Sequence, residues 1–116
     1  MTSPVLPDGK NNYLIDIDGT ITDDIPNEKP ELMVDPKPFK DSVEKLNAKY
    51  REGHIITVFT SRTEEHRKVT EEWLNKNGYL YHQLLMNKPR GGKYIWVDNH
   101  QVTGVLFNGS WENLEL

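Results

Sequence analysis

The sequence predicts an α/β fold built on a mainly parallel sheet, and two observations lead to this prediction. Short apolar runs rich in β-branched residues alternate along the chain with segments whose apolar residues recur at helical spacing. This alternation is typical of open sheets with right-handed crossovers. The chain has 116 residues, the usual length of one domain, so we expect a single unit over residues 1–116.

The first half of the chain predicts a strand, a loop and a helix. Residues 13–17 form a short apolar run that ends at an Asp-Gly pair, which indicates a strand with a sharp exit. Residues 20–35 are polar and contain two prolines, so we expect a flap loop there. Apolar residues at helical spacing over 39–50 predict a helix that ends near Gly53.

The second half predicts a further alternation of strands and a helix. Residues 54–60 are apolar and β-branched, as expected of a buried parallel strand. Ser61 and Glu64 have the spacing of a capping box, which predicts a helix from Ser61 to Gly78. Three more strands are expected, over residues 80–86, 94–97 and 102–107.

Composition limits the classes of function. The chain contains no cysteine, which excludes disulfides and thiolate metal sites. The net charge is −4, which argues against nucleic-acid binding on electrostatic grounds. The first ten residues are polar, and no apolar run has the length of a membrane span. We therefore expect a soluble cytoplasmic protein with no membrane partner.

Chemistry-bearing residues follow three of the predicted strands. Asp16 and Asp18 end the first strand, Thr60 ends the second, and Asp98 follows the run over 94–97. The carboxyl ends of parallel strands meet at one edge of a sheet, so we expect these residues to converge. Two carboxylates this close repel each other unless a cation or hydrogen bonds offset the repulsion. A site of hard oxygen ligands without histidine or thiolate favours Mg²⁺.

The string Asp16-Ile17-Asp18-Gly19-Thr20 resembles the first motif, DxDGT, of the haloacid-dehalogenase-like (HAD) phosphatases. Thr60 in VFTSR resembles the second motif, and Asp98 resembles the acid of the fourth. The resemblance spans most of the chain and implies a Rossmann-like three-layer sandwich. The intervals between the motifs are too short for the cap domain of larger relatives, so a HAD-like domain without a cap is expected.

The resemblance implies four catalytic residues. Asp16 would attack phosphorus and carry a transient aspartyl-phosphate. Asp18 would protonate the leaving oxygen and then deprotonate the hydrolytic water. Thr60 and a lysine would stabilise the transferring phosphoryl group. We prefer Lys88 for that lysine, because Asn87-Lys88-Pro89 resembles the pattern of capsule-biosynthesis phosphatases, with Lys93 as the alternative.

The same resemblance implies a metal site and substrate contacts. The expected Mg²⁺ ligands are the Asp16 carboxylate, the backbone carbonyl of Asp18, Asp98 and Asn99. Asn99 stands where many relatives carry a second acid, which lowers the charge available to the cation. The expected substrate contacts are Gly19, Ser61, Arg62 and Lys93.

The sequence thus favours an Mg²⁺-dependent phosphatase acting on a small phosphomonoester, with a sugar phosphate as the expected substrate. A nucleotide or polynucleotide 3′-phosphate is an alternative within the same chemistry. A receiver domain that stores a phosphoryl group is another, although Asp18 argues against it, and a non-catalytic binding protein is a third. A site without a cap either accepts a bulky substrate or is closed by a second subunit in a homo-oligomer, and both remain open.

Overall fold

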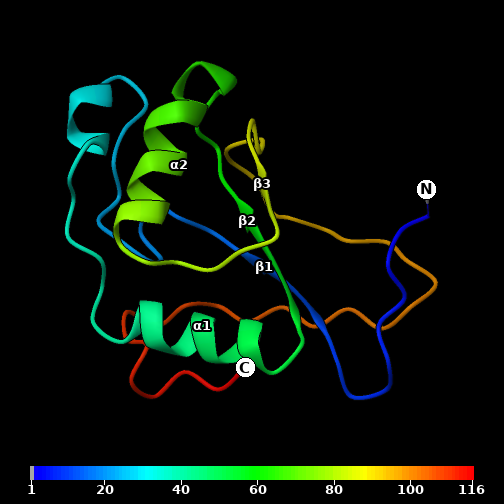
Figure 1. Cartoon of the computed structure of the whole chain (residues 1–116). Coiled ribbons are helices and arrows are strands. Elements are labelled where there is room, and N and C mark those ends of the chain that lie inside the picture. The colour runs from blue at the N-terminus through cyan, green and yellow to red at the C-terminus, as the bar shows by residue number, and fades with distance from the viewer. Residues whose placement is uncertain (1) are drawn as a thin grey trace.

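The computed structural model describes residues 2–116 and contains a three-stranded parallel sheet with two α-helices (Figure 1). In chain order the elements are β1 (Asn12–Ile15), α1 (Ser42–Arg51), β2 (Ile55–Phe59), α2 (Arg67–Lys76) and β3 (Gln83–Leu85). The strands lie in the order β1-β2-β3, and both pairings are parallel. The predicted α/β fold with a parallel sheet is confirmed. Among residues 2–116, no helix has the length and apolar character needed to cross a membrane.

Strand register sorts the apolar side chains onto one buried face. Ile15 pairs with Val58, and Val58 pairs with Leu84 on the next strand, so these three side chains share a face. All three are buried in the core. The helices supply the rest of the core through Leu46 of α1 and Trp73 of α2. A continuous apolar layer between sheet and helices therefore fixes the ends of the strands.

The helices begin later than the sequence predicts. The expected capping box does not form, because α2 starts at Arg67 after a 3-10 turn at Glu64–His66. Ser61 lies in the loop after β2. The backbone of this loop is hydrogen-bonded to the loop after β3, because Asn87 N–H donates to the carbonyl of Arg62 at 2.8 Å. The segment after β2 is therefore held by the segment after β3 rather than wound into a helix.

The strands predicted over residues 94–97 and 102–107 are absent, and that prediction was wrong. Gly91 and Gly92 both adopt positive φ, and the chain turns away from the sheet there. Residues 93–107 contain no strand and are called the strand-free run. Figure 1 shows this run, drawn in orange, extending away from the sheet before it returns toward α1. High β-propensity reflects fit to a half-buried sheet surface, and this run has no strand beside it.

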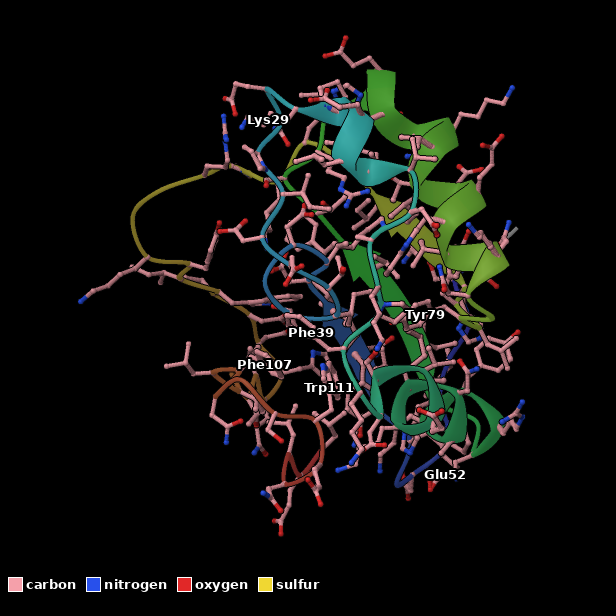
Figure 2. The ribbon with its side chains drawn as sticks, turned by 90° about the vertical axis from the view of Figure 1, so that its left-hand side faces the viewer. Lys29, Phe39, Glu52, Tyr79, Phe107 and Trp111 are labelled. Carbon is pink, nitrogen blue, oxygen red and sulfur yellow. The ribbon has the colours of Figure 1, made fainter. Side chains whose placement is uncertain are left out.

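The C-terminal segment is anchored against the loop that follows β1. Phe107 stacks on Phe39 with ring centroids 6.1 Å apart and lies 5.7 Å from the ring of Trp111. Figure 2 shows these three aromatic side chains close together beside α1. The Trp111 indole N–H donates to the carbonyl of Thr20 at 2.6 Å. This contact joins the end of the chain to the turn that carries Asp16 and Asp18.

Tyr79 provides a test of the core. Its hydroxyl lies 2.7 Å from Ser42 Oγ, and burial raises the pKa of Tyr79 to about 12, with Glu44 adding to the rise and Ser42 opposing it. The folded state favours the neutral form of Tyr79. The contribution of Tyr79 to the free energy of unfolding is therefore complete below pH 10 and is lost as pH rises through 12. We expect the free energy of unfolding to fall by about 2 kcal/mol between pH 10 and 12.

The Tyr79→Phe variant should lack this fall, because it has no hydroxyl to ionise. Urea unfolding of both proteins at several alkaline pH values measures the difference. Parallel losses of stability in the two proteins would contradict the assignment.

Candidate functional site

Asp16 lies immediately after β1, with its carboxylate held between a cation and a hydroxyl. The Lys88 ammonium donates to Oδ1 at 3.0 Å, and Thr20 Oγ1 donates to Oδ2 at 3.0 Å. The Asp16 side chain is 34 % exposed, so one side of the carboxylate is open to solvent. An anionic oxygen with fixed orientation and solvent access is thus present at the carboxyl end of β1.

A tight turn sets the position of both aspartates. The carbonyl of Ile17 accepts hydrogen bonds from the N–H groups of Thr20 and Ile21, and Gly19 N–H donates to the carbonyl of Thr22 at 2.8 Å. Gly19 has φ of +82°, a conformation that favours glycine. The turn therefore requires glycine at this position of the motif, since a residue with a side chain would be strained at this φ.

Asp18 forms a buried ion pair with Arg62. The Arg62 guanidinium donates twice, from Nε to Oδ2 at 3.1 Å and from Nη2 to Oδ1 at 2.8 Å. The Asp18 side chain is 9 % exposed and the Arg62 side chain 0 %. A third guanidinium nitrogen donates to Thr70 Oγ1 of α2 at 3.0 Å, so the pair also joins the turn to the helix. Arg62 was expected to contact substrate, yet its side chain is enclosed by protein groups.

Thr60 directly follows β2, and its polar atoms hold the neighbouring loops. Its side-chain oxygen accepts from Arg62 N–H at 3.2 Å, and its carbonyl accepts from Lys88 N–H at 2.9 Å. Asn87 adopts a φ of +66°, which turns the chain just before Lys88. The structure therefore brings Lys88, rather than the alternative Lys93, into contact with Asp16.

The flap over residues 20–35 borders these loops. Asn27 Nδ2 donates to the carbonyl of Ser61 at 3.1 Å, and Glu28 lies 3.9 Å from Arg90 in an exposed ion pair. Ser61 thus meets the flap through its backbone. The flap contains a short 3-10 turn at Pro30–Met33 and contacts both loops that flank Asp16.

Asp98 and Asn99 were expected at the end of a strand, but no strand directly precedes them in the structure. Asp98 is in the strand-free run, where Trp96 Nε1 donates to Oδ2 at 3.0 Å and His100 N–H donates to Oδ1 at 3.1 Å. These two hydrogen bonds hold the pKa of the Asp98 carboxyl below its usual value. Within residues 2–116, no three acidic or histidine side chains are grouped as a metal site would require.

The donor set around Asp16 fits a magnesium ion held by few protein ligands. Mg²⁺ commonly keeps several waters and binds one or two carboxylates together with substrate phosphate. Each Asp16 oxygen accepts one hydrogen bond, but the carboxylate is partly exposed, whereas the Asp18 carboxylate is enclosed with Arg62. The fit therefore rests on the Asp16 carboxylate, and ligation by the Asp18 backbone carbonyl, Asp98 and Asn99 stays a prediction.

Sequence reasoning missed the residues that hold the site together. Thr70 lies on α2 and was seen only as part of a helix, although its hydroxyl bonds Arg62 and donates to the carbonyl of His66 at 2.8 Å. The hydrogen bond between Trp111 and the Thr20 carbonyl has no local signature either, since the partners are far apart in the chain. Thr20 could have been found, because it belongs to the DxDGT string.

No protein-family model matches the chain, and no curated protein matches it. In fold the chain is similar to the crystal structure of an MCSG target from Vibrio cholerae. The TM-score is 0.55 at 22 % identity, and the match covers 76 % of this chain and 79 % of that one. This likeness concerns the fold alone and agrees with a Rossmann-like α/β arrangement.

Removing the Arg62 side chain should destabilise the protein strongly. Arg62→Met leaves the Asp18 carboxylate buried without its partner, so we expect a loss of about 3–5 kcal/mol in the free energy of unfolding. Lys76→Met breaks a matched but exposed ion pair with Asp35 and should cost less than about 1 kcal/mol. Chemical denaturation of the two variants checks this. Equal losses in both would show that burial does not strengthen the role of Arg62.

Proposed function

We infer that this chain is a phosphomonoesterase of the HAD-like type, with Asp16 as its nucleophile. The observation that carries the proposal is the Asp16 carboxylate itself: it stands at the end of a parallel strand, is 34 % exposed, and has an ammonium group 3.0 Å away. A carboxylate attacking a phosphate dianion needs positive charge nearby to offset repulsion between anions. Lys88 supplies that charge beside the attacking oxygen.

In the first step, one Asp16 oxygen would attack phosphorus while the bond from phosphorus to the leaving oxygen breaks. Thr20 fixes the carboxylate by its hydrogen bond to Oδ2, which holds the other oxygen toward Lys88. Lys88 would then stabilise the phosphoryl oxygens as charge moves onto them. Thr60 lies on the adjoining loop, where its carbonyl is bonded to the Lys88 backbone.

In the second step, water would attack phosphorus while the bond from phosphorus to the Asp16 oxygen breaks, so that inorganic phosphate leaves and Asp16 returns to its free carboxylate. Asp18 is the residue proposed to transfer protons in both steps. Its two hydrogen bonds from Arg62 give it a fixed orientation, and its 9 % exposure leaves limited access to the site. Proton transfer through Asp18 would therefore require a small movement of the turn.

Magnesium is proposed as the cofactor, held by Asp16 together with substrate oxygens and water. When bound it would neutralise phosphoryl charge. Three residues would carry out the other steps. Asp16 attacks phosphorus, Lys88 lowers the repulsion between the carboxylate and the phosphate, and Thr20 orients the Asp16 carboxylate.

The proposal is tested by replacing the nucleophile. Asp16→Asn should lower turnover of a generic aryl phosphate at least about a thousandfold, because the amide cannot form the covalent intermediate. Hydrolysis is measured with and without Mg²⁺. Asp23→Asn, at an exposed acid of the neighbouring flap, is the control and should retain activity. Undiminished hydrolysis in Asp16→Asn would end the nucleophile assignment.

The lysine assignment is tested separately. Lys88→Met should lower kcat by about a hundredfold or more, as expected for loss of a charge that stabilises the transition state. Lys93→Met should have the smaller effect on kcat, because Lys88 rather than Lys93 is bonded to Asp16. Steady-state kinetics of both variants decides between them. A larger loss of kcat in Lys93→Met would reverse the assignment.

One observation favours a second candidate, a domain that holds a phosphoryl group instead of releasing it. Arg62 binds both oxygens of Asp18 and thereby limits its access to a hydrolytic water. A slowly hydrolysed aspartyl-phosphate would follow. Treatment with a small acyl phosphate, followed by measuring the lifetime of the phosphoprotein, distinguishes the two: seconds or less favours the enzyme, and hours favours the phosphoryl-holding domain.

A further inference from the structure

A hollow of about 440 Å³ lies between β2 and the strand-free run, and its walls are mainly apolar. Phe59 of β2 forms one wall, and residues 94–97 form another. The four side chains of that run are strongly exposed: Tyr94 63 %, Ile95 81 %, Trp96 57 % and Val97 89 %. Exposed apolar side chains gathered on one wall of a concavity are typical of ligand-binding sites.

The hollow adjoins the Asp16 carboxylate through Lys88. The Lys88 ammonium lies 3.0 Å from Asp16 Oδ1, 5.4 Å from the centre of the Phe59 ring and 5.2 Å from the centre of the Tyr94 ring. Both rings line the hollow. A phosphoryl group placed against Lys88 and Asp16 would therefore direct its ester substituent into the space between these aromatic side chains.

The polar atoms of the aromatic residues that line the hollow already form hydrogen bonds within the protein. Tyr94 donates its hydroxyl proton to the carbonyl of Pro89 at 2.7 Å, and Trp96 donates its indole N–H to Asp98 at 3.0 Å. Lys93 supplies the one charged side chain among the lining residues. A sugar pressed into this hollow would lose water from its hydroxyl groups without gaining partners for them, which is costly. A flat aromatic ring needs only the faces of Phe59, Tyr94 and Trp96.

Building on the proposed function, we propose that the substrate is a phosphate monoester carrying a planar aromatic group, such as a nucleobase or an aryl ring, which binds in this hollow. Charge and shape agree with this occupant: the ammonium groups of Lys88 and Lys93 suit the phosphate, and ring faces suit a stacked base. This class differs from the sugar phosphate expected from the sequence and agrees with the nucleotide alternative.

The test compares two pairs of substrates that share the type of leaving oxygen within each pair. A nucleoside 5′-monophosphate is compared with ribose 5-phosphate, and benzyl phosphate with cyclohexylmethyl phosphate. Stacking of one base on aromatic side chains predicts a ratio of kcat/KM of about tenfold to a hundredfold in favour of each aromatic member. The first pair reports on a nucleobase and the second on a simple aryl ring, so the two sources of the aromatic group are distinguished.

Substitutions in the hollow test whether the preference for aromatic substrates arises there. Trp96→Ala should bring both ratios toward one, and Trp96→Phe, which keeps a ring face, should restore most of the preference. Leu106→Ala is the matched control, because Leu106 is 93 % exposed on the same strand-free run but outside the hollow, and its ratios should equal those of the wild type. Calorimetric binding of the same four compounds to Asp16→Asn gives a second measure that does not depend on turnover.

The outcomes separate this inference from the proposed function. Hydrolysis of all four compounds with ratios near one would overturn the aromatic hollow and leave the phosphatase standing. Preferred binding of the aromatic compounds without any hydrolysis would support the hollow and overturn the phosphatase. Aromatic preference that persists in Trp96→Ala and Tyr94→Leu would also overturn the assignment to this hollow.

Discussion

The buried guanidinium of Arg62 is the constraint on which the arrangement of the site depends. A charge removed from water must be fully bonded, and Arg62 finds its partners on two separate parts of the chain, the turn after β1 and helix α2. These bonds allow little freedom in how the turn, the end of β2 and the helix meet. The parallel sheet brings these segments to one edge, and the ion pair then fixes them there.

That constraint separates the two aspartates of the motif. Asp18 faces inward and completes the internal network, whereas Asp16 faces the solvent and meets Lys88. Side chains two positions apart on an ideal strand would share a face, but the turn at Gly19 begins before the second aspartate can continue the strand. The same acidic residue type is therefore enclosed in an ion pair at one position and partly exposed beside a lysine at the other.

Much of this fold follows from local pattern, and the exceptions have physical causes. The strands at β1 and β2 were predictable because their apolar runs are short, β-branched and bounded by turn residues. The run over 94–97 has a comparable β pattern, yet pattern cannot tell whether a neighbouring strand is within reach. Trp96 in this run is accordingly 57 % exposed instead of buried in a sheet. The convergence of Asp16 with Lys88 could be anticipated from a motif, whereas the pairing of Asp18 with Arg62 depends on a contact between distant parts of the chain.

The anchoring of Trp111 on the Thr20 carbonyl has a consequence for biosynthesis. The two residues are separated by 91 positions, so the hydrogen bond between them cannot form until residue 111 has been synthesised and has left the ribosome. A nascent chain halted before that point could assemble the sheet and helices but would lack the bond that closes the turn beside Asp16. Closure of the acidic turn is therefore expected to follow the synthesis of all the strands and helices of the fold.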